Sequence, residues 1–254
     1  MNRGVLVTGG SRGIGRAIAV AFAEQGDRVV VHYAAAREDA EQTLALLEGS
    51  GHTLVAGDLG DPAAAQRVAD VAEAELGGVD VLVNNAGIVP TADSLQRLPE
   101  VTYLDWQRIW RQMVDVNLLG AANVTYCVAQ HLIGRHAAGS IVNVGSRGAF
   151  RGEPDFPAYG ASKAALHAFG QSMAVALAPE GIAVTSVAPG FVATDRQETM
   201  LATPAGAAIR DQSPFGRVAT PQEVAAAVIY LASPAAAWAS GTIVDLNGAS
   251  YLRG

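Results

Sequence analysis

The sequence predicts a doubly wound α/β fold, a parallel sheet of about seven strands with helices on both faces. Seven short runs rich in β-branched residues alternate with longer, alanine-rich segments of helical period along the 254 residues. Nearly every run is apolar throughout, which is typical of strands covered on both sides. Strict alternation of strand and helix favours parallel pairing with right-handed crossovers. No linker, repeat or low-complexity tract divides the chain, so we expect a single domain over residues 1–254.

The predicted strands are short and hydrophobic. In chain order they read GVLVT, RVVVHY, TLVAGD, VDVLVNN, SIVNVGS, IAVTSVAP and TIVDLN. The stretch 190–218, after the sixth of them, is the least regular part of the chain. Because open α/β sheets bind ligands beyond the carboxyl ends of their strands, this stretch is a candidate substrate lid.

The predicted helices carry start and stop signals. GRAIAVAFAEQG ends at Gly26, and REDAEQTLALLEGSG forms the second helix. Asp61 and Thr220 each stand as an N-cap before a proline at the first helical position, opening DPAAAQRVADVAEAELG and TPQEVAAAVIYLAS. Between these two lie a long helix over 104–135 and a further helix that contains YGASK.

Composition excludes several classes of protein. Half of the residues are hydrophobic and 16% are charged, which argues against disorder. The net charge of −7, without any cluster of Lys or Arg, argues against nucleic acid or anionic membrane as a partner. No stretch approaches the length of a membrane span or a signal peptide, and Cys127 is the only cysteine. We therefore expect a soluble protein of the cytoplasm.

A glycine-rich turn follows the first predicted strand. Gly9, Gly13 and Gly15 stand in LVTGGSRGIGRAIA, directly before a helix. Glycines let the backbone approach a pyrophosphate closely, and the helix N-terminus offers free N–H groups to the anion. A tight turn of purely structural value is the alternative. The position at the first strand–helix junction favours nucleotide binding.

A second unusual feature lies in the apolar helix that contains YGASK. Tyr159 and Lys163 are four residues apart, so they lie on one helical face. A lysine that snorkels beside a packed tyrosine is one interpretation. A proton-transfer pair is the other, because an adjacent ammonium favours the phenolate and lowers the pKa of a phenol toward neutral pH.

Four motifs together resemble the short-chain dehydrogenase/reductase family. They are the glycine turn, NNAG at 84–87, the serine that ends SIVNVGS, and YGASK, in the order of the family and over essentially the whole chain. PGFVATD and the segment RVATPQEVAAAVIYLAS are most similar to the 3-oxoacyl-[acyl-carrier-protein] reductase branch. The resemblance implies a Rossmann-like fold and an oxidoreductase of CH–OH groups.

The resemblance also implies a set of cofactor-binding residues. They are Gly9, Ser11, Arg12, Gly13, Ile14, Gly15, Tyr33, Asp58, Leu59, Asn85, Ala86, Gly87, Tyr159, Lys163, Pro189, Gly190 and Thr194. NAD enzymes of the family carry an acid where this chain has Tyr33, whereas Arg12 matches the base that faces the 2′-phosphate of NADP, and Arg37 could assist. We expect NADP(H) to be preferred, with NAD(H) possible.

The implied catalytic set is Asn117, Ser146, Tyr159 and Lys163. Tyr159 would exchange the proton, Lys163 would tune it and bind the nicotinamide ribose, and Ser146 would hold the substrate oxygen. Asn117 would join a water to the lysine, or else simply kink its helix. His167, Trp106 and Trp110 are expected in the core or at a subunit interface. The histidines and Cys127 show no metal-site pattern, so no metal is expected.

The expected activity is NADPH-dependent interconversion of a carbonyl and a secondary alcohol. A 3-oxoacyl thioester is the leading substrate, and a small cyclic, sugar or steroid-like ketone is the alternative. Docking of an acidic carrier protein favours a basic rim, yet the lid offsets Arg196, Arg210 and Arg217 with Asp195, Glu198 and Asp211. A non-catalytic NADPH-binding regulator is a second hypothesis. By the same resemblance we expect a homotetramer, joined through the long helices and through the last helix and strand.

Overall fold

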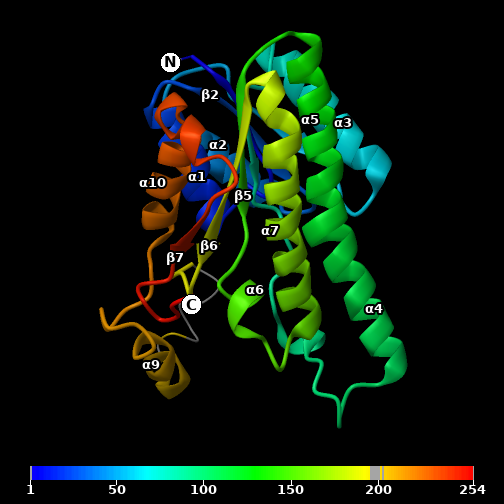
Figure 1. Cartoon of the computed structure of the whole chain (residues 1–254), viewed down its shortest axis with the longest axis vertical. Helices are drawn as coiled ribbons and strands as arrows, with labels where there is room; N and C mark the ends of the chain where they lie inside the picture. Colours follow the sequence, from blue (N-terminus) through cyan, green and yellow to red (C-terminus); the bar gives the residue numbers. More distant parts are fainter. Residues whose placement is uncertain (1, 195–200, 202, 254) are drawn as a thin grey trace.

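Seven strands form one parallel sheet in the computed structural model, which describes residues 2–194, 201 and 203–253 (Figure 1). The strands stand in the order β3-β2-β1-β4-β5-β6-β7. Their bounds are β1 Gly4–Val7, β2 Arg28–Tyr33, β3 Thr53–Ala56, β4 Val81–Asn84, β5 Gly139–Val144, β6 Ile182–Pro189 and β7 Ile243–Leu246. The chain builds outward from β1 to β3 and then returns to place β4 beside β1, so the predicted doubly wound fold is confirmed.

Helices connect the successive strands and cover the two faces of the sheet. They are α1 Gly13–Glu24, α2 Arg37–Ala45, α3 Pro62–Leu76, α4 Tyr103–Val114, α5 Ala121–Gly134, α6 Gly148–Arg151, α7 Pro157–Leu177, α9 Pro204–Arg210 and α10 Pro221–Leu231. Short 3-10 turns are η1 Ala92–Ser94, η3 Ala178–Glu180 and η4 Pro234–Ala239. Both predicted N-caps are present: the Asp61 carboxylate accepts from the N–H of Ala63, and the Thr220 hydroxyl accepts from the N–H of Glu223. Among the described helices, none is long and apolar enough to cross a membrane.

Two apolar layers sandwich the sheet, one on each face (Figure 1). On one face α1 and α10 pack together over the central strands, around Ile18, Phe22 and Val228. On the other face α3, α5 and α7 pack side by side, around Val68, Leu132 and Leu177. Because the strands are covered on both sides, their side chains are apolar at successive positions, as the sequence predicts.

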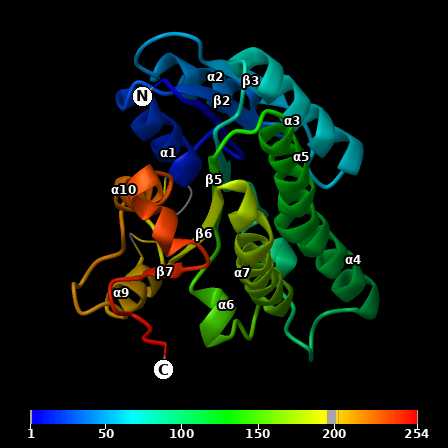
Figure 2. The same ribbon diagram turned by 45° about the horizontal axis from the view of Figure 1, so that its top comes forward.

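The long helix predicted over 104–135 is one continuous rod over 103–134, visible in Figure 2 as α4 running into α5. Its middle, Asp115–Gly120, is a π-helical turn, which the sequence did not predict. π-helical turns are rare and frequently mark functional sites, because they shift the backbone register by one residue. This one carries Asn117.

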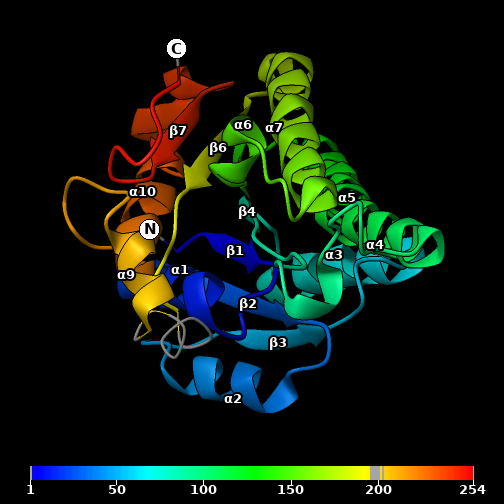
Figure 3. The same cartoon turned by 90° about the horizontal axis from the view of Figure 1, so that it is seen from below.

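The carboxyl ends of the strands meet α6, α9 and the start of α7, seen from below in Figure 3. The stretch 190–218 is more regular than predicted: it contains α9, and Val192 pairs with Ala219 in an isolated bridge. Residues 195–200 and 202, which include Asp195, Arg196 and Glu198, lie outside the described residues.

Candidate active site

A turn with two left-handed glycines links β1 to α1. Gly9 and Gly13 have φ of +63° and +55°, a region that favours glycine. A Cβ at Gly15 would lie 2.2 Å from the carbonyl oxygen of Gly9, so the turn closes only because this position has no side chain. No side chain caps the first N–H groups of α1. The turn therefore offers a backbone cradle of N–H groups to an anion, as a dinucleotide site requires.

The segment after β4 holds this turn in place. The Asn85 side-chain amide donates to the carbonyl oxygens of Thr8 and Gly9, at 3.0 and 2.9 Å. The backbone N–H groups of Asn85 and Ala86 both donate to the Thr8 hydroxyl. On the other side Thr194 packs against Gly13, its methyl group 3.2 Å from where a Cβ would be. Residues predicted to bind the cofactor thus meet around one turn.

The buried side chain of His32, on β2, hydrogen-bonds to the backbone of the same turn. Its Nδ1 accepts from the backbone N–H of Gly9 at 3.0 Å, so the proton is on Nε2, which donates to the carbonyl of Gly57 at 2.9 Å. The ring is buried, and burial lowers the pKa of His32, which keeps the acceptor form at neutral pH. Sequence reasoning missed this role. The one available signal is a histidine within the otherwise apolar RVVVHY.

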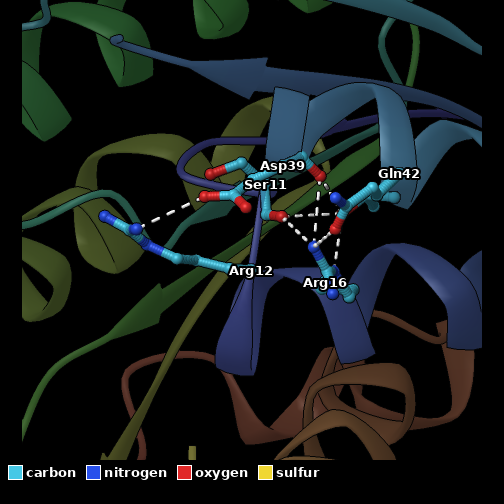
Figure 4. A network of polar contacts seen from close by, with 6 residues as sticks. Ser11, Arg12, Arg16, Asp39 and Gln42 are labelled. Carbon is cyan, nitrogen blue, oxygen red and sulfur yellow. Dashed lines mark hydrogen bonds and ion pairs between the residues drawn. The ribbon is translucent and has the colours of Figure 1, made fainter. Parts of the chain in front are cut away.

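Charged residues of α1 and α2 form a network beside the turn (Figure 4). Arg12 pairs with the carboxylate of Asp39 at 3.3 Å, and both side chains remain partly exposed. Arg16 donates to the carbonyl oxygens of Ser11 and Asp39 and to the hydroxyl of buried Thr43. Arg16 and Thr43 therefore fix the backbone of Asp39, so the counter-ion of Arg12 is held in place.

Further residues predicted for the cofactor stand at or just after the carboxyl ends of β2, β3 and β6. Tyr33 is buried at the end of β2, and Asp58 is exposed after β3, where its carboxylate accepts from the N–H of Gly60. The Leu59 side chain packs in the core rather than at the edge. Pro189 ends β6, and the N–H of Gly190 donates to the carbonyl of Leu246.

Ser146, Tyr159 and Lys163 come together between β5 and α7. The Ser146 hydroxyl lies near enough to the phenol of Tyr159 to lower its pKa, and it accepts from the N–H of Gly148 at 3.0 Å. Lys163 Nζ donates to the carbonyl oxygen of Val144 at 3.0 Å. These two residues of α7 thus face the end of β5, where a carbonyl substrate could reach the phenol and the hydroxyl together.

Burial controls the titration of both side chains. It raises the pKa of Tyr159, an effect opposed by the hydrogen bond from Ser146 and reinforced by the charge of Glu153. Burial also lowers the pKa of Lys163 to about 8. The pKa of Tyr159 is thus raised rather than lowered as predicted, and Lys163, whose ammonium donates to Val144, is not among the causes of the shift. The phenol of Tyr159 is accordingly protonated at neutral pH.

Asn117 in the π-helical turn is fully buried and joins three segments. Its side-chain oxygen accepts from the N–H of Ile88 at 2.7 Å, and its amide donates to the carbonyl of Ile88 and to the hydroxyl of Ser162. A Cβ on Gly87 would lie 3.1 Å from Asn117 Oδ1 and 3.3 Å from Lys163 Nζ. Gly87 therefore lets Asn117 and Lys163 approach the same point.

His167 lies in the core, one of the two places predicted for it. Its ring stacks on Phe150 and packs against Gly145, directly behind Ser146. Burial lowers its pKa to about 4, so the ring is neutral.

Trp106 and Trp110 lie beside each other on α4, with ring centroids 5.8 Å apart. Within the described part of the chain, no group of histidine, cysteine or acidic residues could hold a metal ion.

Comparison with known proteins places this geometry in context. Residues 9–248 match the family model described as enoyl-(acyl carrier protein) reductase. A 3-oxoacyl-[acyl-carrier-protein] reductase of Vibrio cholerae is 36% identical, over 97% of this chain and 96% of its own length. The L-rhamnose 1-dehydrogenase (NAD(P)(+)) of a Sphingomonas species is 35% identical, over 98% and 96%. A short-chain dehydrogenase of Burkholderia cenocepacia, solved in complex with NADP, has a TM-score of 0.84 and 32% identity, over 98% and 97%.

Proposed function

The chain belongs to the short-chain dehydrogenase/reductase family of oxidoreductases that act on alcohol and ketone groups, and we propose that it interconverts a carbonyl compound and a secondary alcohol with NADP(H). The observation that carries this proposal is the convergence of Ser146, Tyr159 and Lys163 at the carboxyl edge of the sheet. The glycine turn that would hold a dinucleotide lies at the same edge, joined to this site through Gly87.

The residues of the turn fit a dinucleotide. Side chains at Gly9 or Gly15 would collide with backbone atoms, and the first N–H groups of α1 lack a side-chain cap. The turn would hold the pyrophosphate, Lys163 the nicotinamide ribose, and Thr194 the nicotinamide amide. NADP(H) is favoured because Tyr33 replaces an acid at the end of β2 and because Arg12, by the family resemblance, would face a 2′-phosphate. The solved relative in complex with NADP supports the same choice.

NAD(H) also remains usable under this proposal, because each candidate cation for the 2′-phosphate is paired. Arg12 faces Asp39 at 3.3 Å, and Arg37 faces Glu41 at 2.8 Å. These carboxylates offset the attraction that a 2′-phosphate would feel. The Sphingomonas relative, named for both cofactors, fits this mixed character.

The chain's own residues would act on the proton and the oxygen. A bound nicotinamide supplies the hydride in the reductive direction. Ser146 donates a hydrogen bond to the carbonyl oxygen and stabilises its developing negative charge. Tyr159, held protonated by burial, donates its proton to that oxygen. Lys163 would return a proton to Tyr159 through a water, and Asn117, buried beside Lys163, would hold that water against the lysine.

A 3-oxoacyl thioester is the leading substrate, since a reductase of that class is 36% identical over nearly the whole chain. A sugar is the second candidate, favoured by the L-rhamnose dehydrogenase at 35%. Arg217, one of the cations that could receive an acidic carrier, pairs instead with Glu223 at 2.6 Å. We propose that the segment 190–218, with α9, closes over the substrate.

A homotetramer is the proposed assembly, in the reducing cytoplasm that a lone Cys127 suits. Exposed apolar side chains on two pairs of elements support it. They are Tyr126 on α5 and Val175 on α7, and Tyr230 on α10 and Trp238 of η4, the turn that precedes the edge strand β7. Apolar surface of this kind favours burial against another copy.

The experiment is an initial-rate measurement of NADPH oxidation against an acetoacetyl thioester, a sugar panel and small ketones, with NADH in parallel. Turnover with NADPH, at a higher kcat/KM than with NADH, is expected for at least one carbonyl. Equal use of the two cofactors would overturn the preference for NADP(H). Tight NADPH binding without turnover in either direction would favour the non-catalytic regulator.

A further inference from the structure

A buried arginine directly follows the proposed catalytic serine. Arg147 is 4% exposed, and its backbone N–H donates to the carbonyl of Pro189 at 2.8 Å, which fixes it at the end of β6. Its guanidinium donates to the hydroxyl of Ser250 and to the side-chain oxygen of Gln212, and lies over the ring of Phe191. All of these partners are neutral.

A second arginine converges on the same acceptor. Arg151, at the end of α6, donates to Gln212 Oε1 at 3.1 Å, and Arg147 donates to that same atom at 3.0 Å. Neither guanidinium forms an ion pair with a carboxylate among residues 2–194, 201 and 203–253. Burial and the charge of Arg151 both lower the pKa of Arg147, while the charge of Glu153 acts in the opposite direction. Two like charges thus meet at one amide oxygen.

This arrangement is costly for Arg147, which is buried beside the exposed Arg151 and forms no ion pair with a described carboxylate. A buried charge is normally compensated by an opposite charge, and two adjacent guanidinium groups repel each other. Paired guanidinium groups are the preferred protein ligands of carboxylate and phosphate oxygens. Gln212 presents a single oxygen where either anion would present two. It belongs to the segment after α9, which lies across the end of β6 from α6 (Figures 1 and 3).

We infer that Arg147 and Arg151 bind an anionic group, a carboxylate or a phosphate, of the substrate itself, and that this group takes the place of Gln212 Oε1. The inference rests on the proposed function and narrows its substrate to oxo acids, hydroxy acids or their phosphorylated equivalents. The reacting oxygen would be held by Ser146, which precedes Arg147 in the chain, so both groups would contact one substrate at the end of β5. Because the protein has a net charge of −7, its overall field repels anions, so an anion would be bound by these two arginines and not by a general attraction to the surface.

The test compares matched substrates that differ only in charge. Acetoacetate and levulinate are measured against their methyl esters, and dihydroxyacetone phosphate against dihydroxyacetone, with NADPH and with wild type, Arg151→Gln and Arg147→Lys. Arg108→Gln on exposed α4 is the control for loss of one surface charge. We expect at least one anion to have a kcat/KM about tenfold above its neutral partner, and Arg151→Gln to remove that advantage by raising KM for the anion only. The comparison of the oxo acids with their esters tests a carboxylate, and the comparison of dihydroxyacetone phosphate with dihydroxyacetone tests a phosphate.

Two results would overturn the inference. One is equal kcat/KM for every anion and its neutral partner; the other is an Arg151→Gln variant that slows both equally, as a purely structural tie would. If no carbonyl is turned over at all, the proposed function fails, and calorimetric titration of acetoacetate and of inorganic phosphate decides instead. Binding that weakens in Arg151→Gln and not in Arg108→Gln supports the anion site, and absence of binding contradicts it.

Discussion

At the scale of single residues, the proposed chemistry depends on partly buried Tyr159 and buried Lys163, whose pKa values are shifted by desolvation in opposite directions. Tyr159 is held in its protonated form, and Lys163 has a pKa lowered to about 8. Each shift follows from the same cause, because a poorly solvated site disfavours the charged form of any group. The pair is therefore phenol and ammonium near pH 7, the state that reduction requires.

The pH dependence of reduction follows from these shifts. Lys163 is charged below about pH 8 and loses its charge above it, while Tyr159 stays protonated through that range. We expect kcat/KM for reduction to be level around neutral pH and to fall as pH rises through about 8. Steady-state rates at saturating NADPH, with NADPH affinity measured at each pH, test this. A rate that climbs through pH 8 would contradict it.

Cofactor choice is the second prediction at this scale, and it concerns Asp39. Removing the counter-ion frees Arg12 for a 2′-phosphate, so Asp39→Asn should bind 2′,5′-ADP about fivefold more tightly, roughly 1 kcal/mol. Affinity for 5′-AMP should not change. Calorimetry measures both, and Glu41→Gln on the same helix removes the same charge from the Arg37 pair as a comparison. Equal gains for both nucleotides would mean that Asp39 does not act on the 2′-phosphate.

At the scale of elements, the site depends on segments that local sequence specifies only in part. The strands, the caps at Asp61 and Thr220 and the glycine turn were predictable, because each has a short-range pattern of its own. The π-helical turn around Asn117 was not, since one turn of π-helix has the same apolar pattern as α-helix. One-turn α6 and short α9 are too brief to show a period.

Long-range contacts explain what else the sequence left open. The Asn117, Ser146, Tyr159 and Lys163 set was predicted through resemblance, and the structure brings it together; its catalytic role stays a prediction. Gln212 beside Arg147 and Asp39 beside Arg12 were not foreseen. Such partners are distant in sequence, and no periodicity or spacing relates them.

The glycine turn gives the element-scale prediction. In Gly15→Ala the new Cβ would lie 2.2 Å from the Gly9 carbonyl oxygen, so the turn must open. NADPH affinity should fall by at least about tenfold, or roughly 1.4 kcal/mol, while the circular dichroism spectrum stays native. Gly134→Ala is the control, because a Cβ there meets nothing and alanine favours a helix. Unchanged affinity in Gly15→Ala would show that the turn does not hold the cofactor.

At the scale of the whole molecule, large apolar side chains are exposed on two surfaces, that of α5 and α7 and that of α10 and η4. Trp238 is fully exposed and Tyr230 largely so, which is unfavourable for an isolated subunit. The proposed tetramer buries both surfaces, whereas a monomer would leave them in water.

Assembly is therefore testable by a charge placed on one surface. Trp238→Arg should lower the mass measured by light scattering from a multiple of 26.1 kDa to a smaller multiple. Val71→Arg, on the exposed side of α3, should leave the mass unchanged. Equal masses for wild type and Trp238→Arg would exclude this surface from the interface.

The central claim, that Tyr159 donates the proton in carbonyl reduction, is tested most directly by Tyr159→Phe. The measurement pairs NADPH affinity by fluorescence titration with initial rates on the best carbonyl substrate. The account predicts retained cofactor binding and a kcat lower by about 10² to 10⁴, the usual contribution of a positioned acid. A variant that binds NADPH and reduces the substrate at the wild-type rate would contradict it.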